Sequence, residues 1–314
     1  MAKLSNALVL LAIACLPLTA PARAQPIRTF VALTGTDANP CTFALPCKSV
    51  QHAHDVVAAG GEIRMLDRGS YGLLTITKAI SIHGDGFGAI AAQNNADAIT
   101  INAGPNDKIN LRGLVIEGFG SGGSGITFNS GGTLDIQDCL IRNFIFHGIN
   151  FVPTGASVLL VSNSHIAANV GNGIVVAPPV GTAAVSVVVD RSVIERNGFV
   201  GVFANGDASF FHGTLDLTVS DSVVSHNGGK GIMLAGAGAT ILGMVRGSVI
   251  AGHMGGEGLL SSGGLATLRV TKSTIWHNAT GFAAQFSAGL ISFGDNSLDG
   301  NTTDGAPTST IGYH

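Results

Sequence analysis

Charged residues are scarce in this chain of 314 residues: Asp, Glu, Lys and Arg make up 11% of it, and the formal net charge is −3. The few basic residues are scattered, so the sequence forms no patch suited to a nucleic-acid backbone. Aromatic residues are also few, at 6%. A hydrophobic content of 46% nevertheless excludes an intrinsically disordered chain. We therefore expect a folded protein with no nucleic-acid partner.

Long hydrophobic runs are absent beyond the first segment of the chain. Residues 1–24 have the pattern of a signal peptide, with Lys3 near the start, an apolar run from Ala7 to Leu18, and a small-x-small cleavage motif that ends at Ala24. The apolar run holds 12 residues, whereas a bilayer span needs about 20. We expect a secreted or periplasmic protein with no membrane attachment after signal cleavage; a retained anchor is the alternative.

Cysteine is rare as well, with four in the chain, and one of them, Cys15, lies in the predicted signal peptide. Cys41 and Cys47 bracket a segment that can close as a disulfide in an oxidising compartment. Such a small loop contributes about 2 kcal/mol to stability. Metal binding by this pair is the alternative, but no histidine stands at a ligand-like spacing beside it. Cys139 shares an inward column with serines of other repeats, so we expect a small buried thiol.

Glycine is abundant, with 45 residues, and suits a fold built from many tight turns. A motif recurs eight times between Leu111 and Asn301: an apolar residue, a small residue three places on, a second apolar residue two places later, and usually Asn three further. The spacings between successive copies are 25, 25, 28, 30, 26, 25 and 23 residues. This period predicts a solenoid in which each unit buries its apolar face against its neighbours. The second apolar position falls at Ile116, Ile141, Ile166, Ile194, Val224, Ile250, Ile275 and Leu298.

Within each copy the apolar period is two, which predicts strands. About 25 residues per coil accommodate two or three short strands, stacked about 4.8 Å apart as parallel sheets. Bends such as Ser220-Asp221 reset the alternation. We interpret the recurring asparagines as inward amides that bind turn backbone from coil to coil. Their column comprises Asn169, Asn197, Asn227, Asn278 and Asn301, with His253 in one copy.

These repeats resemble those of right-handed parallel β-helix proteins of the pectin-lyase-like superfamily. The segment TFVALTGTDANPCTFALPCKSVQHAHDVVAAGGEIRMLDRGSYG strengthens the resemblance, which implies a first strand and a short helix that cap the open end. Ser49 is the expected helix N-cap, and Gly60-Gly61 the expected stop. We expect residues 25–60 to form this capping region, which includes the Cys41–Cys47 disulfide, and residues 61–314 to form the all-β parallel β-helix. The polar stretch from Thr302 to His314 is expected to cover the far end.

The resemblance implies an extended acidic polysaccharide as the substrate class, but it does not supply an active site. The segment from Phe146 to Ile149 (FHGI) and that from Asn301 to Gly305 (NTTDG) are similar to polygalacturonase motifs, yet their order is inverted. The Asp pair and the basic motif of those enzymes are absent, and no pair of carboxyls spaced for inverting hydrolysis is evident. The Gln, Asp and Arg pattern of pectin methylesterases is not apparent either.

Lyase chemistry requires a cation for the uronate carboxylate and a base for the C5 proton of the sugar. Registry places five outward side chains on one wall of the rod, and these are the catalytic candidates: Arg142, Glu195, Arg196, His226 and His277. Trp276, on the same wall, and His147, just before a glycine column, are candidates for substrate binding. The alternative is an ordinary solvated face.

A second candidate site lies where two consecutive coils have longer connections, at residues 177–184 and 205–213. Polar and aromatic side chains there can stack on and bind sugar rings, and the alternative is that the aromatics cover the flank of the rod. The candidates are Asp207, Phe210, Phe211 and His212.

No metal or other cofactor is predicted. Asp138, Asp221 and Asp295 share an outward register, but Arg191 and Lys272 lie beside them, so surface ion pairs explain them better than a Ca²⁺ site. The coils also lack the nonapeptide of calcium-binding β-rolls. Two functional hypotheses remain, with the oligomeric state open. The first is an exported β-helix that binds, and in its stronger form cleaves, an acidic polysaccharide; the alternative is a non-catalytic structural or binding rod of the envelope or cell surface.

Overall fold

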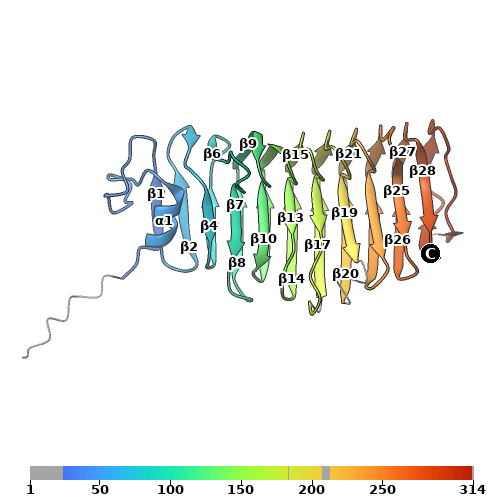
Figure 1. Cartoon of the computed structure of the whole chain (residues 1–314), viewed down its shortest axis with the longest axis horizontal. Helices are drawn as coiled ribbons and strands as arrows, with labels where there is room; N and C mark the ends of the chain where they lie inside the picture. The colour runs from blue at the N-terminus through green and yellow to red at the C-terminus, as the bar shows by residue number, and fades with distance from the viewer. Residues whose placement is uncertain (1–23, 183, 207–212, 313–314) are drawn as a thin grey trace, which may run out of the picture.

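The structure, a computed structural model, describes residues 24–182, 184–206 and 213–312. Its strands stack side by side into an elongated rod, with the helix α1 (Val50–Val56) at the N-terminal end (Figure 1). The predicted signal peptide lies outside the described residues, except for Ala24. In the part of the chain that is described, no helix is long and apolar enough to cross a membrane.

Three parallel sheets run along the rod, and successive strands of the chain pass from sheet A to B to C. Among the described residues, sheet A comprises β1 (Arg28–Val31), β2 (Gly61–Met65), β5 (Ile80–His83), β8 (Lys108–Arg112), β11 (Thr133–Gln137), β14 (Ser157–Ser162), β17 (Ala184–Asp190), β20 (Thr214–Ser220), β23 (Thr240–Arg246), β26 (Ala266–Thr271), β29 (Gly289–Ser292) and β31 (Ser309–Thr310). Sheet B comprises β3 (Gly69–Ser70), β6 (Gly88–Ala91), β9 (Val115–Gly122), β12 (Leu140–Phe144), β15 (His165–Ala167), β18 (Val193–Glu195), β21 (Val223–Ser225), β24 (Val249–Ala251), β27 (Thr274–Trp276) and β30 (Ser297–Asp299). Sheet C comprises β4 (Leu74–Ile76), β7 (Ile99–Asn102), β10 (Ile126–Ser130), β13 (Ile149–Phe151), β16 (Ile174–Val176), β19 (Val202–Gly206), β22 (Ile232–Gly236), β25 (Glu257–Ser262) and β28 (Thr280–Gln285).

The register confirms that the repeated apolar residues stack directly over one another. In sheet B, Ile141 pairs with Ile116 on one side and Ile166 on the other, and the column continues through Ile194 to Val224. Every strand pair in the three sheets is parallel. The predicted parallel β-helix is therefore confirmed, with one copy of the sequence motif in each coil from β8 onward.

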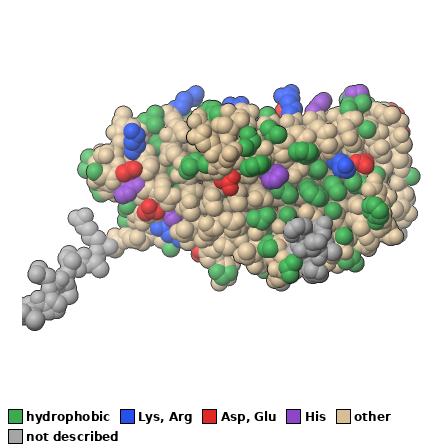
Figure 2. Space-filling view, viewed as in Figure 1, with side chains coloured by type: hydrophobic (Ala, Val, Ile, Leu, Met, Phe, Trp, Pro, Cys, Tyr) green, Lys and Arg blue, Asp and Glu red, His purple; other side chains and the backbone are tan. Residues whose placement is uncertain are grey.

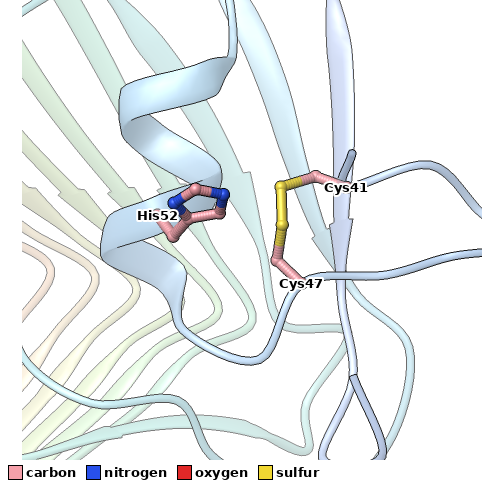
Figure 3. A group of neighbouring side chains, drawn as sticks. All are labelled: Cys41, Cys47 and His52. Carbon is pink, nitrogen blue, oxygen red and sulfur yellow. A yellow bond between two sulfur atoms is a disulfide. The ribbon is translucent and has the colours of Figure 1, made fainter. Parts of the chain in front are cut away.

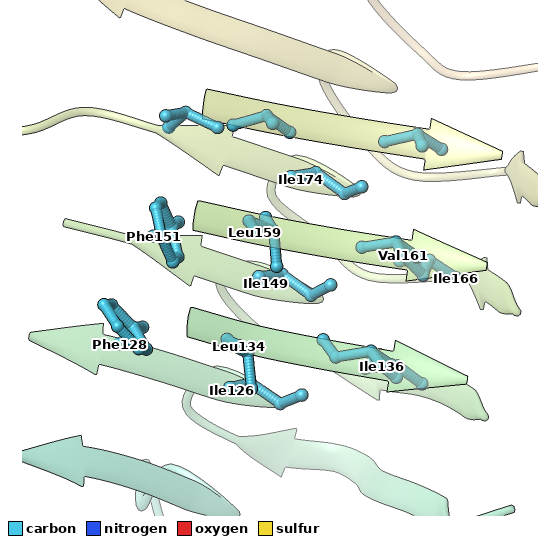
Figure 4. Packing of buried hydrophobic residues seen from close by; sticks show 14 of the residues in the cluster. Ile126, Phe128, Leu134, Ile136, Ile149, Phe151, Leu159, Val161, Ile166 and Ile174 are labelled. Carbon is cyan, nitrogen blue, oxygen red and sulfur yellow. The ribbon is translucent and has the colours of Figure 1, made fainter. Parts of the chain in front are cut away.

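Alternate residues of the strands point inward and form one continuous core. Columns of like side chains are visible in Figure 4, where Ile126, Ile149 and Ile174 lie one above another. Phe128 and Phe151 stack with ring centroids 4.5 Å apart. Each fully buried side chain of this size contributes about 1.5–3 kcal/mol, so the core grows in proportion to the number of coils.

Two bends in each coil use backbone with positive φ, which turns the chain between sheets A and B and again after sheet B. At the first bend φ is 54° at Asp138 and 47° at Asp221, as the Ser220-Asp221 bend predicted. At the second bend φ is 63° at Asn143, 53° at Arg196 and 53° at His226. Side chains at these positions therefore recur once per coil on the outside of the rod.

Buried polar ladders satisfy the turn backbone behind these bends. The Asn169 amide donates to Asn197 Oδ1, and the Asn197 amide donates to Asn227 Oδ1, both at 2.9 Å. The same oxygens accept the backbone N–H groups of Asn169 and Asn197. A parallel serine ladder runs beside it, in which each hydroxyl accepts the N–H of the preceding coil. The interpretation of the asparagines as inward, structural amides is confirmed.

His253 replaces asparagine in this ladder with the same pattern of donors and acceptors. Its Nδ1 accepts the Asn227 N–H at 3.2 Å, and its Nε2 lies 3.1 Å from the Val224 carbonyl, to which it donates. The ring is fully buried, and this burial lowers its pKa. The nearby charge of His226 also lowers the pKa of His253. The ladder therefore requires the neutral imidazole, because a proton on Nδ1 would remove the acceptor for Asn227.

The N-terminal cap has the predicted parts. Ser49 caps α1 by accepting the His52 N–H at 3.2 Å, and the helix ends at Val56, before Gly60. Cys41 and Cys47 form the predicted disulfide. At the far end, the backbone N–H groups of Gly281 and Phe282 donate to residues 303 and 304. The C-terminal segment thus covers the last strand of sheet C.

Cys139 is buried, as predicted from its serine column. Its sulfur lies 3.5 Å from the Leu114 N–H and 3.2 Å from the Gln137 carbonyl. Burial raises the pKa of this thiol to about 12. Cys139 is therefore a packing residue with little thiolate at neutral pH.

We predict that Asn197→Ala lowers the free energy of unfolding by about 3 kcal/mol, because it leaves two buried donors of Asn169 without an acceptor. The measurement is equilibrium unfolding in urea. Asn150→Ala is the matched control, because that amide lies on the outward side of β13; its effect is expected to stay below about 0.5 kcal/mol. Equal losses in the two variants would contradict the ladder.

We predict that His253→Asn weakens the dependence of stability on pH. The pKa of His253 in the folded chain lies below its ordinary value of 6.5, so the unfolded chain takes up the proton more readily. The neutral His253 ring therefore contributes to the free energy of unfolding above pH 6.5. This contribution is lost as the pH falls through the pKa of His253 in the folded chain. The fall in unfolding free energy between about pH 8 and about pH 5 should be smaller in the variant. His54 and His147 remain in both proteins, so a difference between the two slopes reports on His253.

Candidate functional site

The catalytic candidates, together with Trp276 and His147, lie on the bend that follows sheet B, which we call the B–C edge. It comprises the outward residues that end each sheet B strand and the turn leading to sheet C, at residues 117–125, 142–148, 167–173, 195–201, 225–231, 251–258 and 276–281. From residue 167 onward, each turn begins near the positive-φ bend, continues with a buried ladder residue and ends at the glycine before sheet C. The edge therefore presents two or three outward side chains per coil.

The five catalytic candidates occupy two adjoining columns of this edge. Arg142 and Glu195 share the last strand position of sheet B, with Ala167 between them. Arg196, His226 and His277 occupy the positive-φ position, with Arg196 and His226 on adjacent coils. From β12 to β27 there are five steps between neighbouring strands, which at about 4.8 Å each span about 24 Å. The structure places all five on one wall, but it does not gather them around one point.

Arg142 is held by a buried carboxylate. Its Nε donates to Glu117 Oε2 at 2.7 Å, and Glu117 is only 6% exposed. The other oxygen of Glu117 accepts the Asn143 amide at 2.7 Å and the Phe119 N–H at 3.2 Å. These contacts hold the longer turn of the β9 coil in place. The Arg142–Glu117 pair therefore has a structural role, although the Arg142 side chain is also partly exposed to solvent.

Glu195 links two basic side chains. Its Oε1 lies 3.2 Å from His165 Nε2 and 3.5 Å from Arg196 Nη1. The Arg196 side chain is 72% exposed, so this second pair is weak and open to exchange with another anion. His226 follows on the next coil. Glu195, Arg196 and His226 are therefore the part of the predicted set that lies closest together.

Glycines of the next coil make room for two of the predicted rings. A Cβ built on Gly252 would lie 2.8 Å from the His226 ring, and one on Gly300 would lie 2.6 Å from Trp276 Nε1. Both glycines also have positive φ, 75° and 70°. The Trp276 and His277 rings lie 5.0 Å apart. Each ring thus lies against bare backbone and keeps one side turned to solvent.

His147 lies on the sheet C side of the edge and takes part in a third set of contacts between coils. Its Nδ1 accepts the Asn172 N–H at 3.1 Å, and Asn172 Oδ1 accepts the Val200 N–H at 3.0 Å. Burial lowers the pKa of His147. Further along this column Lys230 pairs with Glu257 at 3.3 Å. His147 is thus held as a neutral acceptor, half-buried beside the edge.

The second predicted site cannot be placed. Asp207, Phe210, Phe211 and His212 lie outside the described residues. The described residues include a mainly apolar hollow of about 450 Å³, lined by Val152, Ala177, Pro179 and Asn205. Ala177 and Pro179 come from the longer connection that the sequence analysis singled out.

A feature that the sequence analysis missed runs along the B–C edge. The side chains of Phe119, Phe146 and Phe199 are 62%, 51% and 61% exposed. Gly171 lies on the coil between Phe146 and Phe199. Its N–H donates to the Phe146 carbonyl and its carbonyl accepts the Phe199 N–H, so the turns that carry Phe146, Gly171 and Phe199 stack on one another. Both Phe146 and Phe199 come two residues before the recurring glycine, a signal that the repeat alignment contains. We call Phe119, Phe146, Val170, Phe199 and Met254 the apolar stripe; all five are exposed.

Figure 2 shows the setting of this edge. Lys, Arg and His side chains recur along its upper margin, where the sheet B strands lie in Figure 1, and hydrophobic side chains spread over the front face. Charge and apolar surface therefore lie side by side along the rod.

The outward aspartates interact as surface residues, although Asp221 does not pair with Arg191, its neighbour by registry. Asp221 lies 3.5 Å from Arg246, and Arg191 lies 2.5 Å from Asp190, so Asp221 and Arg191 do not pair with each other. Arg112 pairs with Asp138 at 3.3 Å. Among the described residues, the group with metal-ligand geometry is Cys41, Cys47 and His52, at the N-terminal cap.

No family model matches the chain, and no curated protein matches it in sequence. Among solved structures, pectate lyase Pel9A superposes with a TM-score of 0.59 and 14% identity, covering 90% of this chain and 79% of that one. The A-module of mannuronan C-5 epimerase AlgE4 from Azotobacter vinelandii gives a TM-score of 0.43 and 12% identity, covering 81% and 91%. The likeness to the pectate lyase shows that the chain has the pectin-lyase-like parallel β-helix fold, as its repeats predicted.

The two arginines of the edge should differ in their effects on stability. We predict that Arg142→Ala lowers the free energy of unfolding by about 2 kcal/mol, because Glu117 is buried and loses its charged partner. Arg196→Ala should cost less than about 0.5 kcal/mol, because its ion pair is exposed. Unfolding in urea measures both, and similar losses would show that Glu117 does not depend on Arg142.

Proposed function

We propose that the protein binds an acidic polysaccharide along the B–C edge, with the polymer lying parallel to the rod axis. One observation carries the proposal: the exposed apolar stripe runs beside a column that holds Arg196, His226 and His277, and both lie at positions that recur along the rod. The fold itself supports a ligand of this class, because pectate lyase Pel9A, named for its action on pectate, is built on the same fold.

The apolar stripe is surface that water does not favour. Exposed apolar side chains aligned in this way mark interaction sites more often than scattered ones do. An aromatic ring offers a flat apolar face with few rotatable bonds, which suits packing against the apolar face of a sugar ring. Phe146 and Phe199 lie two coils apart, about 9.6 Å along the axis. A chain of sugar rings can contact both, whereas a single sugar cannot.

The basic column supplies the charge for a uronate polymer. Arg196 presents an exposed guanidinium, a group whose geometry matches a carboxylate with two parallel hydrogen bonds. His226 and His277 lie on the same column with Gly252 between them. Contacts spread over several coils add up in one polymer chain, so individually weak sites give a useful affinity.

Cleavage is the second candidate function, and it is favoured by the cluster of Glu195, Arg196 and His226. Arg196 would neutralise the uronate carboxylate, while Glu195 or His226 would take the C5 proton in a β-elimination. The Glu195 carboxylate already contacts both His165 and Arg196, so it would have to leave these partners to reach a sugar proton. The remaining candidates lie on other coils, so binding is the function that the geometry supports better.

We further propose that the protein acts outside the cytoplasm. The signal-like pattern of residues 1–24 and the Cys41–Cys47 disulfide support export, because such cross-links persist in oxidising compartments.

Binding to pectate, alginate and chondroitin sulfate, measured by calorimetry, tests the proposal. We predict that Phe146→Ala combined with Phe199→Ala weakens binding to the preferred polymer about tenfold, the effect of losing somewhat over 1 kcal/mol. Arg196→Ala should weaken it severalfold and reduce its salt dependence. Phe286→Ala is the matched control, because that exposed ring lies beyond β28 and outside the stripe.

Retained affinity in the double phenylalanine variant, or no binding to any of the three polymers, would contradict the proposal. The cleavage hypothesis is tested in the same samples by following the absorbance of the unsaturated sugar that β-elimination forms, with Ca²⁺ present. Turnover that Arg196→Ala abolishes supports a lyase. Binding without turnover supports a non-catalytic rod that holds polysaccharide.

A further inference from the structure

A second site lies at the N-terminal cap, away from the B–C edge. Figure 3 shows the disulfide of Cys41 and Cys47 with the imidazole of His52 beside it, on the first turn of α1. The two sulfurs and a ring nitrogen of His52 all lie within 4.8 Å of one another. The expectation that no histidine stands at a ligand-like spacing beside the pair was wrong, because the first turn of α1 brings His52 to the two cysteines.

The surroundings hold these three residues in place independently of the disulfide. Asp37 accepts the Lys48 N–H at 3.0 Å and the Ser49 N–H at 2.8 Å, and its other oxygen accepts the Ser49 hydroxyl. The Cys47 N–H donates to the Phe30 carbonyl at 3.0 Å, and Phe30 in turn donates to Cys41. The segment that carries both cysteines is thus tied to β1 and to the start of α1.

The imidazole of His52 holds no part of this cap by a hydrogen bond, and it interacts with the Asp37 carboxylate through charge alone. Within the described part of the chain its ring nitrogens make no hydrogen bond, in contrast to His54, whose Nε2 accepts the Thr77 N–H at 3.2 Å. Half-buried next to two sulfurs, His52 is available as a ligand.

We propose that the reduced chain binds one zinc ion, or a similar thiophilic divalent cation, through Cys41, Cys47 and His52. A tetrahedral zinc site with Zn–S bonds of about 2.3 Å separates its sulfurs by about 3.8 Å. The opened disulfide meets that requirement with a small movement of two side chains whose Cα atoms lie 4.6 Å apart. His52 needs a shift of about 1 Å to reach the ion, and water takes the fourth position.

A thiol or phosphine reductant supplies two electrons to the Cys41–Cys47 bond and is itself oxidised, and two thiols form. Zinc displaces the two thiol protons and binds the thiolates. A thiol–disulfide oxidant of an oxidising compartment takes the two electrons back, re-forms the disulfide and releases the ion. Zinc and disulfide are therefore alternative cross-links of the same cap.

Titration of the reduced, reductant-free chain with Co²⁺ tests the proposal, because tetrahedral cobalt thiolates have distinctive charge-transfer and visible bands. We expect these bands to saturate at one equivalent, Zn²⁺ to displace the Co²⁺, and the oxidised chain to show none of them. His52→Ala should weaken binding about tenfold or more. Zinc should also raise the melting temperature of the reduced chain and leave that of the oxidised chain unchanged.

Two control variants separate this site from other ligands. His83→Ala removes an outward histidine of sheet A, and Cys139→Ser removes the buried thiol of sheet B; neither should change cobalt binding. The melting curve of oxidised His52→Ala shows whether that variant is folded. The proposal is overturned if the reduced chain gives no thiolate bands, if His52→Ala binds as tightly as the parent, or if Cys139→Ser abolishes binding.

Discussion

The rod depends on hydrogen bonds that run between coils through buried side chains. Sheet hydrogen bonds join strands to strands, but the turn after sheet B would leave its inward N–H groups unpaired in a dry interior, at a cost of about 1–3 kcal/mol each. Asn169, Asn197, Asn227 and His253 remove that cost by accepting these groups from the preceding coil or donating to its carbonyls. Each coil is therefore specified by its neighbours, and the ladder works only when like residues overlie one another.

The same stacking creates the surface that we assign to ligand binding. Because the ladder residue is fixed once per coil, the residues on either side of it are also repeated once per coil and point outward. Arg196 and His226 precede a ladder asparagine, and Phe199 follows one by two places. A structural constraint inside the turn thus sets the spacing of cations and aromatic rings outside it, and that spacing suits a polymer rather than a small molecule.

Most of the fold could be predicted from the sequence, because the information lies in periodicity: the column of Ile141, Ile166 and Ile194, the asparagine ladder and the capping helix are all confirmed. Less of the candidate site could be predicted from the sequence. Glu117 and Arg142 are register partners, one place beyond Ile116 and Ile141, so their contact could have been predicted from the repeat; the burial of Glu117 could not. Registry also gives no information outside the repeats, where a helix and a loop bring His52 to the cysteines.

Hydroxyl-radical footprinting with mass spectrometry shows whether the polymer binds along the B–C edge over several coils. Phenylalanine, methionine and tryptophan side chains react according to their exposure, and the edge carries all three types. We expect saturating uronate polymer to protect Phe146, Phe199, Met254 and Trp276 together, while Phe43 and Phe286 stay reactive. Protection confined to one coil, or to the outward face of sheet A, would contradict it.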